Sequence, residues 1–403
     1  MKFKTFTALR HRNFRLFLTG QAISLGGTWM QSMAQGWLVL KLTDSAFYLS
    51  LVQAMSSLPI LFFSLAGGVI ADRMNKRRLL LITQTSSLVL AAVLGVLVNL
   101  GAVRFWHVML LAGCLGVVNA FDMPGRQSFI IEMVGREDLM NGIALNSAVF
   151  NGARIVGPSA AGFLISAVGI ALCFYLNALS FLAIIFMLAI MRFEKAKEKP
   201  KARPMLKELR EGLVYVNKTP SIKYLILFVA ITSLFMIPYI ALMPVFARDI
   251  LHIGAKGLGV MMGFAGVGAL AGSLSLATFG HRARKAVIAF TAAFISAMAL
   301  LGFSLSRTPL FSYALLIAVG WGMITQFSTV NAAIQQTVPD ELRGRVMSLY
   351  VLVMLGFVPV GNLIIGTLAH YVGTPHAVAA GAVVCVITYA ALLAFARREL
   401  LSS

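Results

Sequence analysis

The sequence predicts an all-α membrane protein with twelve transmembrane helices arranged as two pseudo-symmetric six-helix bundles. Of its 403 residues, 59% are hydrophobic and only 12% are charged, and the mean hydropathy is +0.87. A soluble chain of this length needs a more highly charged surface. Charge-poor runs of about 20 residues, long enough to cross a bilayer, recur along the whole chain. Composition and span length together therefore indicate a polytopic membrane protein.

The distribution of basic residues predicts the topology of these spans. The twelve expected spans are residues 16–40, 46–70, 79–100, 105–133, 140–168, 171–191, 222–246, 257–280, 286–306, 309–334, 346–370 and 376–396. Of the 34 Lys and Arg residues, 28 fall on the same side as the N-terminus, five on the other side, and Arg154 inside a span. The positive-inside rule then makes both termini cytoplasmic. The net charge of +20 is thus topological, and we expect membrane lipids rather than nucleic acid as its partner.

The longest segment between spans divides the chain into two parts. It begins "RFEKAKEKPKARP" and continues with apolar residues at helical spacing, which predicts an amphipathic helix on the inner membrane surface. The apolar face consists of Met205, Leu206, Leu209, Leu213 and Val216. We expect a six-helix half at residues 1–191, a cytoplasmic linker at 192–221 and a second six-helix half at 222–403. Weak repeats such as "VGREDLMNG" and "VPDELRGRV" favour a duplicated transporter with its substrate site between the halves.

The loop after the second span reads "GGVIADRMNKRRLL" and resembles the G-x-L-a-D-r-x-G-r-r/k signature of the major facilitator superfamily. The matching positions are Gly68, Ala71, Asp72, Arg73, Lys76 and Arg77. Asn75 replaces the second glycine, and asparagine tolerates the left-handed backbone of a tight turn. The resemblance implies a gate in which Gly68 permits close helix approach and Asp72 locks the outward-facing state. Positive-inside charge alone would explain the basic residues but not the acid or the glycine.

The fifth span contains "NGARIVGPSAAGF", which resembles the G-x3-G-P-x2-G-G pattern of exporters in this superfamily. Gly157, Pro158 and Gly162 match, whereas Ala153 and Ala161 replace glycines. Small residues four apart permit close packing against another helix, which we expect in the other half, and the proline kinks the helix. The resemblance implies antiport, and ordinary small-residue packing is the alternative explanation.

Longer stretches narrow the resemblance further. The segments "NAFDMPGRQSFIIEMV", "LNALSFL" and "PDELRGRVMSLY" are similar to the subfamily that contains the enterobactin exporter and macrolide-efflux-type proteins. The similarity is strong in the first half of the chain and moderate in the second. It implies the major facilitator fold and an exporter in the bacterial inner membrane, which we expect to be a monomer.

Arg154 is the only charged residue between Asp138 and Arg192, and its position requires a partner. At 1.5 Å per residue it lies about 21 Å into its span, and Asp122 lies about 18 Å from the end of the preceding span. Because isolated charges in a membrane bundle are costly, we predict that Asp122 and Arg154 form a pair. A rival prediction pairs Asp122 with Arg73 or Lys76. The pair is either a static ion pair or a site of proton coupling through Asp122, the deepest carboxylate.

Neutral polar residues on the spans are candidates for lining a substrate cavity. They are Gln21, Thr28, Gln31, Gln35, Gln53, Tyr239, Gln326, Asn331 and Asn362. Hydrogen bonds between helices are an equally good explanation for some of them. Because this surface is amide-rich with methionines and aromatic residues nearby, it suits an amphipathic or apolar substrate.

No pattern in the sequence predicts an enzyme, a metal or a cofactor. There is no metal-ligand cluster, no phosphate loop and no nucleophile–base constellation. We therefore expect a secondary transporter that exports amphipathic small molecules by alternating access, driven by proton antiport. A lipid or lysolipid flippase of the same fold is the first alternative, and a receptor or scaffold that has lost transport is the second.

Overall fold

The computed structural model describes residues 6–191, 205–279 and 284–401. The chain divides into two compact units, which we call the first unit (Met1–Leu42 with Leu58–Ala202) and the second unit (Thr43–Ser57 with Arg203–Ser403). Both are helical, and the described residues contain no strand. This division differs from the predicted halves because residues 43–57 and the linker helix group with the second unit. The predicted boundaries at residues 191 and 222 stay a prediction.

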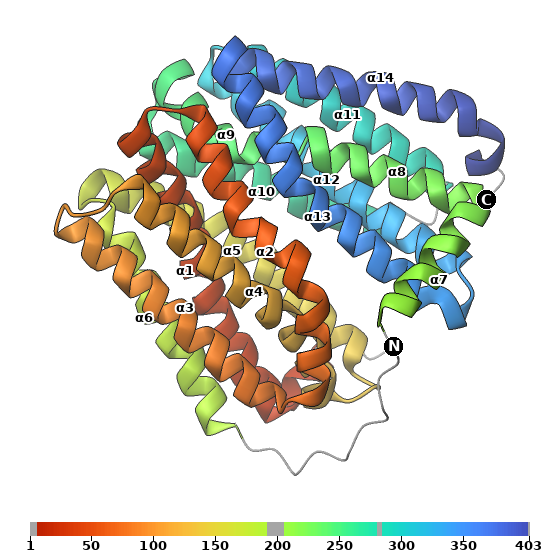
Figure 1. Ribbon diagram of the computed structural model, residues 1–403, viewed down its shortest axis with the longest axis horizontal. Coiled ribbons are helices and arrows are strands. Elements are labelled where there is room, and N and C mark those ends of the chain that lie inside the picture. Colours follow the sequence, from red (N-terminus) through yellow and green to blue (C-terminus); the bar gives the residue numbers. More distant parts are fainter. Residues whose placement is uncertain (1–5, 192–204, 280–283, 402–403) are drawn as a thin grey trace. The chain divides into compact units, whose positions relative to one another are not determined.

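Helices follow one another along the described parts of the chain (Figure 1). The chain up to residue 191 forms η1 (Thr7–Arg10), α1 (Arg12–Thr43), α2 (Ala46–Arg73), α3 (Lys76–Asn99), α4 (Phe105–Val134), α5 (Leu139–Ala167) and α6 (Ala171–Ile190). The remainder forms α7 (Met205–Lys218), α8 (Pro220–Phe235), α9 (Tyr239–Val245), the π-helical turn η2 (Phe246–Ile250), α10 (Gly254–Phe279), α11 (Lys285–Leu305), α12 (Pro309–Thr337), α13 (Asp340–Val372) and α14 (Thr374–Leu401).

Most of the helical residues belong to stretches that can span a membrane. In the described part of the chain, eleven helical stretches are long and apolar enough to cross a bilayer. The twelfth span is α1, which has 32 residues. Its polar side chains, which we call the polar stripe of α1, lower its hydropathy; they include Gln21, Thr28, Gln31 and Gln35. The predicted all-α class with twelve spans is confirmed.

The seventh span is broken rather than continuous, which the sequence prediction of a single helix over 222–246 missed. The carbonyl of Thr232 accepts hydrogen bonds from the amides of both Met236 (2.9 Å) and Ile237 (3.1 Å), so the helix ends there. Pro238 follows and has no amide hydrogen to continue the ladder. The chain then forms the α-helix α9, which is followed directly by the π-helical turn η2. This span therefore consists of three short helical pieces.

The first unit is organised around α3, which packs against both α4 and α6 (Figure 1). Aromatic side chains fill the core where α1 approaches α4, and the rings of Phe17 and Phe129 meet edge to face with centroids 5.8 Å apart. Both residues are almost fully buried, together with Leu80 of α3 and Leu188 of α6. Four helices therefore converge on one apolar cluster, and this fixes the rotation of α3 about its axis.

The turn between α4 and α5 holds the N-terminal turn η1 in place. The amide of Ala8 donates a hydrogen bond of 2.9 Å to the side-chain oxygen of Asn141, and the ring of His11 meets the carboxylate of Asp138 at 2.9 Å. Hydrogen bonds from Thr7 and His11 hold the pKa of Asp138 below its ordinary value. The turn η1 is thus anchored by polar contacts at the start of α5.

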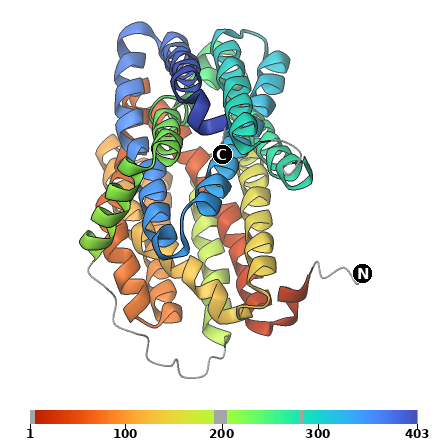
Figure 2. The same ribbon diagram turned by 90° about the vertical axis from the view of Figure 1, so that its right-hand side faces the viewer.

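Glycines bring two helices of the second unit into backbone contact. A Cβ added at Gly268 of α10 would lie 2.0 Å from the carbonyl oxygen of Ile317, and one at Gly320 of α12 would lie 2.0 Å from that of Ala265. No side chain fits at either position, so the glycines permit the close approach of α10 and α12. These helices lie together with α11 in both views, coloured teal to light blue (Figures 1 and 2).

The short helix α7 occupies the segment for which the sequence predicts an amphipathic helix. Glu211 forms an ion pair of 2.6 Å with Arg345 of α13, and Val216 is buried whereas Leu213 is exposed. Residues 192–204 and the side chains of Met205, Leu206 and Leu209 lie outside the described residues. The described end of α7 is therefore attached to the second unit by packing and by charge.

Candidate functional site

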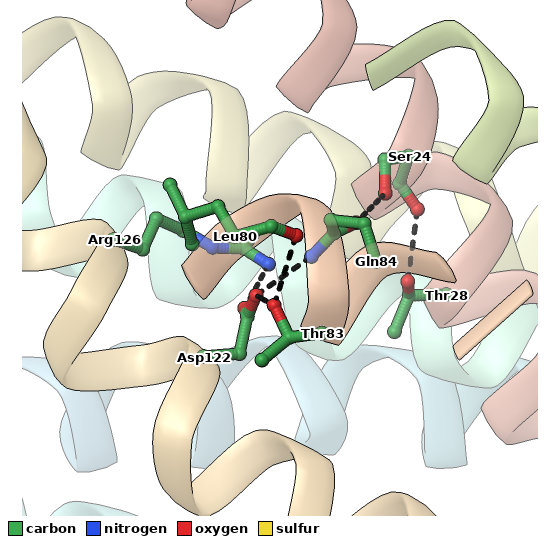
Figure 3. Close-up of polar contacts among 7 residues, drawn as sticks. All are labelled: Ser24, Thr28, Leu80, Thr83, Gln84, Asp122 and Arg126. Carbon is green, nitrogen blue, oxygen red and sulfur yellow. Dashed lines mark hydrogen bonds and ion pairs between the residues drawn. The ribbon is translucent and has the colours of Figure 1, made fainter. Parts of the chain in front are cut away.

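A buried polar site in the first unit is built around the carboxylate of Asp122 on α4. This residue is only 3% exposed. Its Oδ1 accepts hydrogen bonds of 2.7 Å from both Thr83 Oγ1 and Gln84 Nε2 on α3. Its Oδ2 is paired with the guanidinium of Arg126, one turn further along α4. Figure 3 shows the three donors converging on the carboxylate from two helices.

The contacts of Asp122 extend to a third helix. The Oγ of Ser24 on α1 donates a weak hydrogen bond of 3.5 Å to Gln84 Oε1 (Figure 3). The amide of Gln84 therefore links α1 to the carboxylate on α4. We call Ser24, Thr83, Gln84, Asp122 and Arg126 the carboxylate network. A change in the charge of Asp122 would alter hydrogen bonds on three helices at once.

The predicted pairing of Asp122 with Arg154 is wrong, because the structure pairs Asp122 with Arg126. The rival prediction is also wrong for Lys76, whose Nζ pairs with Glu132 at 2.5 Å. Arg73 is exposed at the end of α2. Counting residues along helices gives depth but not rotation, and an arginine four residues on lies on the same helix face as the aspartate. That i, i+4 spacing was the signal in the sequence that would have identified Arg126.

Arg154 is held instead against an aromatic side chain of α1. Its guanidinium carbon lies 5.8 Å from the centroid of the Trp29 ring, at the distance of a cation–π interaction. The Trp29 ring in turn meets Phe150 edge to face, with centroids 5.7 Å apart. The Trp29 ring thus stabilises the charge for which the sequence predicted a carboxylate partner.

The Gly-Pro pattern of α5 lies against the same part of α1. A Cβ at Gly157 would lie 2.7 Å from both the Gly26 carbonyl oxygen and the Trp29 Cβ. Pro158 and Gly162 are also buried. The contact that the structure gives for Gly157 is therefore with α1 of the first unit, whereas the sequence predicted a partner in the other half. Arg154 and Gly157 together attach α5 to the Trp29 region.

The basic loop between α2 and α3 uses its residues to fix helix ends. Asn75 begins α3 as its N-cap, in extended conformation with φ of −62°, and its side chain accepts a hydrogen bond from the Arg78 amide. The expected left-handed turn at Asn75 is therefore wrong. Arg77 donates hydrogen bonds to the carbonyls of Leu188 (2.6 Å) and Ala189 (2.5 Å) at the end of α6, where a cation is favoured by the helix dipole.

The structure contradicts the role predicted for the glycine of the gate and does not test the role predicted for its acid. A Cβ at Gly68 would meet open space, whereas one at Gly67 would lie 2.1 Å from the carbonyl oxygen of Ala120 on α4. The close approach of α2 thus belongs to Gly67, because neighbouring positions point about 100° apart around a helix. The side chain of Asp72 lies outside the described residues, so its role as a lock stays a prediction.

The polar stripe of α1 is used largely for contacts within the first unit. Gln31 is buried, and its Oε1 accepts a hydrogen bond of 2.7 Å from Asn177 of α6. Thr28 donates to the carbonyl of Ser24 at 2.9 Å. Gln21 is buried, Gln35 is half-buried and Gln53 of α2 is exposed. These contacts favour the structural explanation for Gln31 and Thr28.

A second polar cluster lies inside the second unit. Gln326 of α12 donates a hydrogen bond of 2.5 Å to Thr232 of α8, and Thr232 contacts the hydroxyl of Tyr389 on α14 at 2.7 Å. Gln326 Oε1 and Asn362 Nδ2 are buried without a hydrogen-bond partner within the described residues. Thr232 and Tyr389 were missed because a single hydroxyl on an apolar helix gives no periodic signal.

The remaining cavity candidates are less tightly grouped. Tyr239 is buried at the start of α9, next to the break in the seventh span. Asn331 is half-buried on α12 and accepts a hydrogen bond of 2.6 Å from Gln335. Across the described ranges, no group of three His, Cys, Asp or Glu side chains could hold a metal ion.

Comparison with known proteins identifies the family. The description "transmembrane secretion effector" belongs to the family whose sequence profile matches residues 3–402. The chain belongs to this family of the major facilitator superfamily. Members of the superfamily are membrane transporters rather than enzymes. The predicted resemblance and the multi-pass membrane location are thereby confirmed.

Curated relatives align with this chain over almost their whole length. The staphyloferrin A transporter of Staphylococcus aureus is 23% identical over 89% of this chain and 90% of its own. The multidrug efflux pump Tap of Mycolicibacterium fortuitum is 27% identical over the same shares. Macrolide efflux protein A of Streptococcus pyogenes is 22% identical over 91% and 93%.

Solved structures share the fold. A bacterial homologue of the human lysosomal transporter Spinster, in an inward-facing and unoccupied conformation, superposes with a TM-score of 0.77. It has 13% identity over 97% of this chain and 98% of its own. A D-xylose–proton symporter gives a TM-score of 0.74 at 10% identity, over 95% and 97%. The two pseudo-symmetric six-helix bundles predicted from the sequence are confirmed as the major facilitator fold.

Proposed function

We propose that the chain exports amphipathic small molecules across the bacterial inner membrane by alternating access, in exchange for protons. Both termini lie in the cytoplasm, and the protein works as a monomer. The family assignment and the named relatives, which transport a siderophore or pump out drugs and macrolides, support export. The charge distribution of 28 basic residues against five supports the orientation.

The observation that carries the proton-coupling part is the carboxylate network. As a carboxylate, Asp122 only accepts hydrogen bonds, and it has three donors, from Thr83, Gln84 and Arg126. A proton on one oxygen turns that oxygen into a donor and removes the ion pair with Arg126. The added O–H donor then stands among three groups that are themselves donors, so at least one of these contacts has to change. Proton binding is thereby linked to the packing of α3 against α4, a mechanical change that a transporter can use.

The polar cluster of the second unit supports the proposed substrate class. The unpartnered side-chain atoms Gln326 Oε1 and Asn362 Nδ2 offer one acceptor and one donor without net charge. Thr232 and Met236 lie on the same helical piece, at its end, and Tyr389 contacts both. This cluster is buried and neutral, and its chemistry matches a substrate with apolar area and a few hydrogen-bonding groups better than a phosphate or a small cation.

The test is substrate-stimulated proton movement in proteoliposomes that contain a trapped pH indicator, with erythromycin, a siderophore and a lysolipid as probes. We expect erythromycin or the siderophore to cause proton flux with the wild type. Asp122→Asn should abolish the flux while retaining the substrate-induced rise in melting temperature. Glu137→Gln, an equal loss of charge at an exposed residue outside the network, should behave as the wild type.

Three outcomes separate the proposal from its alternatives. Unchanged pH-dependent transport by Asp122→Asn would remove Asp122 from the coupling mechanism. Movement of the lysolipid alone would favour the flippase. Stabilisation by a probe without any transport, in the wild type, would favour the receptor or scaffold.

A further inference from the structure

A groove of about 640 Å³ runs along the outer side of α3 and α4 in the first unit. Ile82, Thr85 and Val89 of α3 line it, and so does Cys114 of α4. The side chains of Ile82 and Val89 are each 50% exposed. Apolar side chains exposed in the middle of a transmembrane helix face lipid, so the groove opens into the bilayer.

The groove and the carboxylate network use opposite sides of α3. Thr83 and Gln84 are buried and face Asp122, whereas Ile82 and Thr85 are exposed and face the groove. The groove is therefore separate from the site to which we assign proton coupling. Whatever fills it contacts the helix that carries two of the three donors to Asp122.

The length of the groove matches one leaflet of a membrane. Along α3 it extends from Arg78 to Leu90, which is about 18 Å at 1.5 Å per residue. Half of a hydrocarbon core of about 30 Å is about 15 Å. Cys114, at the far end of the groove, lies nine residues from the start of α4 and thus near the middle of the bilayer. An acyl chain that begins near Arg78 would end near Cys114.

The charge at the end of the groove selects the head group. Arg78 lies there with its side chain exposed, and the residues that line the groove include no carboxylate. Its neighbours are used differently, because Lys76 pairs with Glu132 and Arg77 caps α6. A guanidinium at the membrane surface forms bidentate hydrogen bonds with phosphate. The groove thus combines an apolar channel one leaflet deep with a phosphate-binding cation at its mouth.

We propose that this groove binds an anionic phospholipid, with one acyl chain along α3 and α4 and its phosphate on Arg78. The assignment to the inner leaflet rests on the orientation in the proposed function, but binding itself requires neither transport nor proton coupling. The ligand is a resident lipid, held from the bilayer side of the helix pair.

Cys114 provides the probe for the test. It is exposed, whereas the other two cysteines, Cys173 and Cys385, are buried, so a small fluorescent thiol reagent labels Cys114 selectively. The labelled protein is placed in nanodiscs containing phosphatidylcholine with equal mole fractions of brominated phosphatidylglycerol or brominated phosphatidylcholine. We expect the anionic lipid to quench more strongly, with an apparent preference of about fivefold, which corresponds to about 1 kcal/mol for one arginine near the surface.

Matched variants assign the preference to the groove. Arg78→Gln should remove it, whereas Arg136→Gln, an equal change at an exposed arginine outside the groove, should keep it. Label-free mass spectrometry should detect less bound phosphatidylglycerol for Val89→Trp, which fills the groove, than for Val93→Trp, one turn beyond it. Soluble glycerol phosphate should not compete.

Defined results would overturn the proposal. These are equal quenching by both lipids in the wild type, an unchanged preference in Arg78→Gln, or equal lipid retention by the two tryptophan variants. Competition by glycerol phosphate would show a site for free phosphate instead of a lipid. Because none of these measurements involves substrate or a pH gradient, loss of transport coupling in Asp122→Asn leaves their outcome unaffected.

Discussion

The ion pair between Asp122 and Arg126 makes a quantitative prediction about folding stability. The perturbation is a double-mutant cycle of Asp122→Asn, Arg126→Gln and the double variant. Each substitution removes one charge; the change at Asp122 keeps the size of the side chain, and the change at Arg126 shortens it. The cycle isolates the energy of the pair from the separate contributions of the two residues.

Burial of the two side chains determines the expected magnitudes. The Asp122 side chain is 4% exposed and that of Arg126 is 19% exposed. Arg126→Gln leaves a buried carboxylate that retains Thr83 and Gln84 as donors, and we expect a loss of about 3 kcal/mol, the lower end for a broken buried pair. Asp122→Asn leaves a cation that reaches water, at a cost of about 1.5 kcal/mol. The double variant should lose only about 2 kcal/mol, so the coupling energy is about 2.5 kcal/mol.

Reversible unfolding in mixed micelles measures these free energies, and thermal melting gives an independent ranking of the four proteins. The matched control is Arg136→Gln, at an exposed position of the α4–α5 turn, which should change stability by less than about 0.5 kcal/mol. If the losses of the two single variants simply add in the double variant, the pair contributes no coupling. The description of a linked carboxylate network would then be refuted.

Three further predictions concern helix contacts. Gly157→Val should lower the melting temperature through a loss of about 1–3 kcal/mol of folding stability, because its Cβ would overlap the Trp29 region of α1. The control is Gly152→Ala on the same helix, where a Cβ meets open space. An equal loss in the control would contradict the prediction. Asn75→Ala should cost about 1 kcal/mol by removing the N-cap of α3, while Asn75→Asp retains it; calorimetry of both decides. Because the folded-state pKa of Asp138 is lowered, its contribution to holding η1 is present above the ordinary carboxylate pKa and lost as pH falls through the folded value. The protection of backbone amides near residue 8 against hydrogen exchange, relative to an unstructured peptide at the same pH, should fall below about pH 4. Asp138→Asn should remove this pH dependence.

Helix positions were predictable because burial in lipid demands long apolar runs whatever their tertiary neighbours are. The observed boundaries of α4 and α6 agree with the predicted spans to within one residue. The break in the seventh span was not foreseen, although Pro238 was visible in the sequence. Proline is tolerated in membrane helices when the freed carbonyls find other partners, so its presence alone does not decide between a kink and an interruption.

The sequence identified Asp122 as a residue of the candidate site, but it did not identify the side chain that pairs with it. Asp122 was correctly located as a deep carboxylate, since depth follows from counting along a helix. Its partners depend on the rotation of α3 and α4, which is set by distant packing around Phe17 and Phe129. The close glycine was placed at Gly68 rather than Gly67 for the same reason. One residue changes little in depth and about 100° in direction.

The interrupted seventh span gives the second unit one compliant element among stiff ones. A π-helical turn contains an extra residue, and Phe246–Ile250 adopts it directly after two short helical pieces. Such a span can change its length or twist by moving the wide turn along the chain, because each hydrogen bond lost is replaced by another. By contrast α12 is locked to α10 through backbone contacts at Gly268 and Gly320. A change in the length of this span would therefore be absorbed between residues 236 and 250, whereas the contact between α10 and α12 would stay fixed.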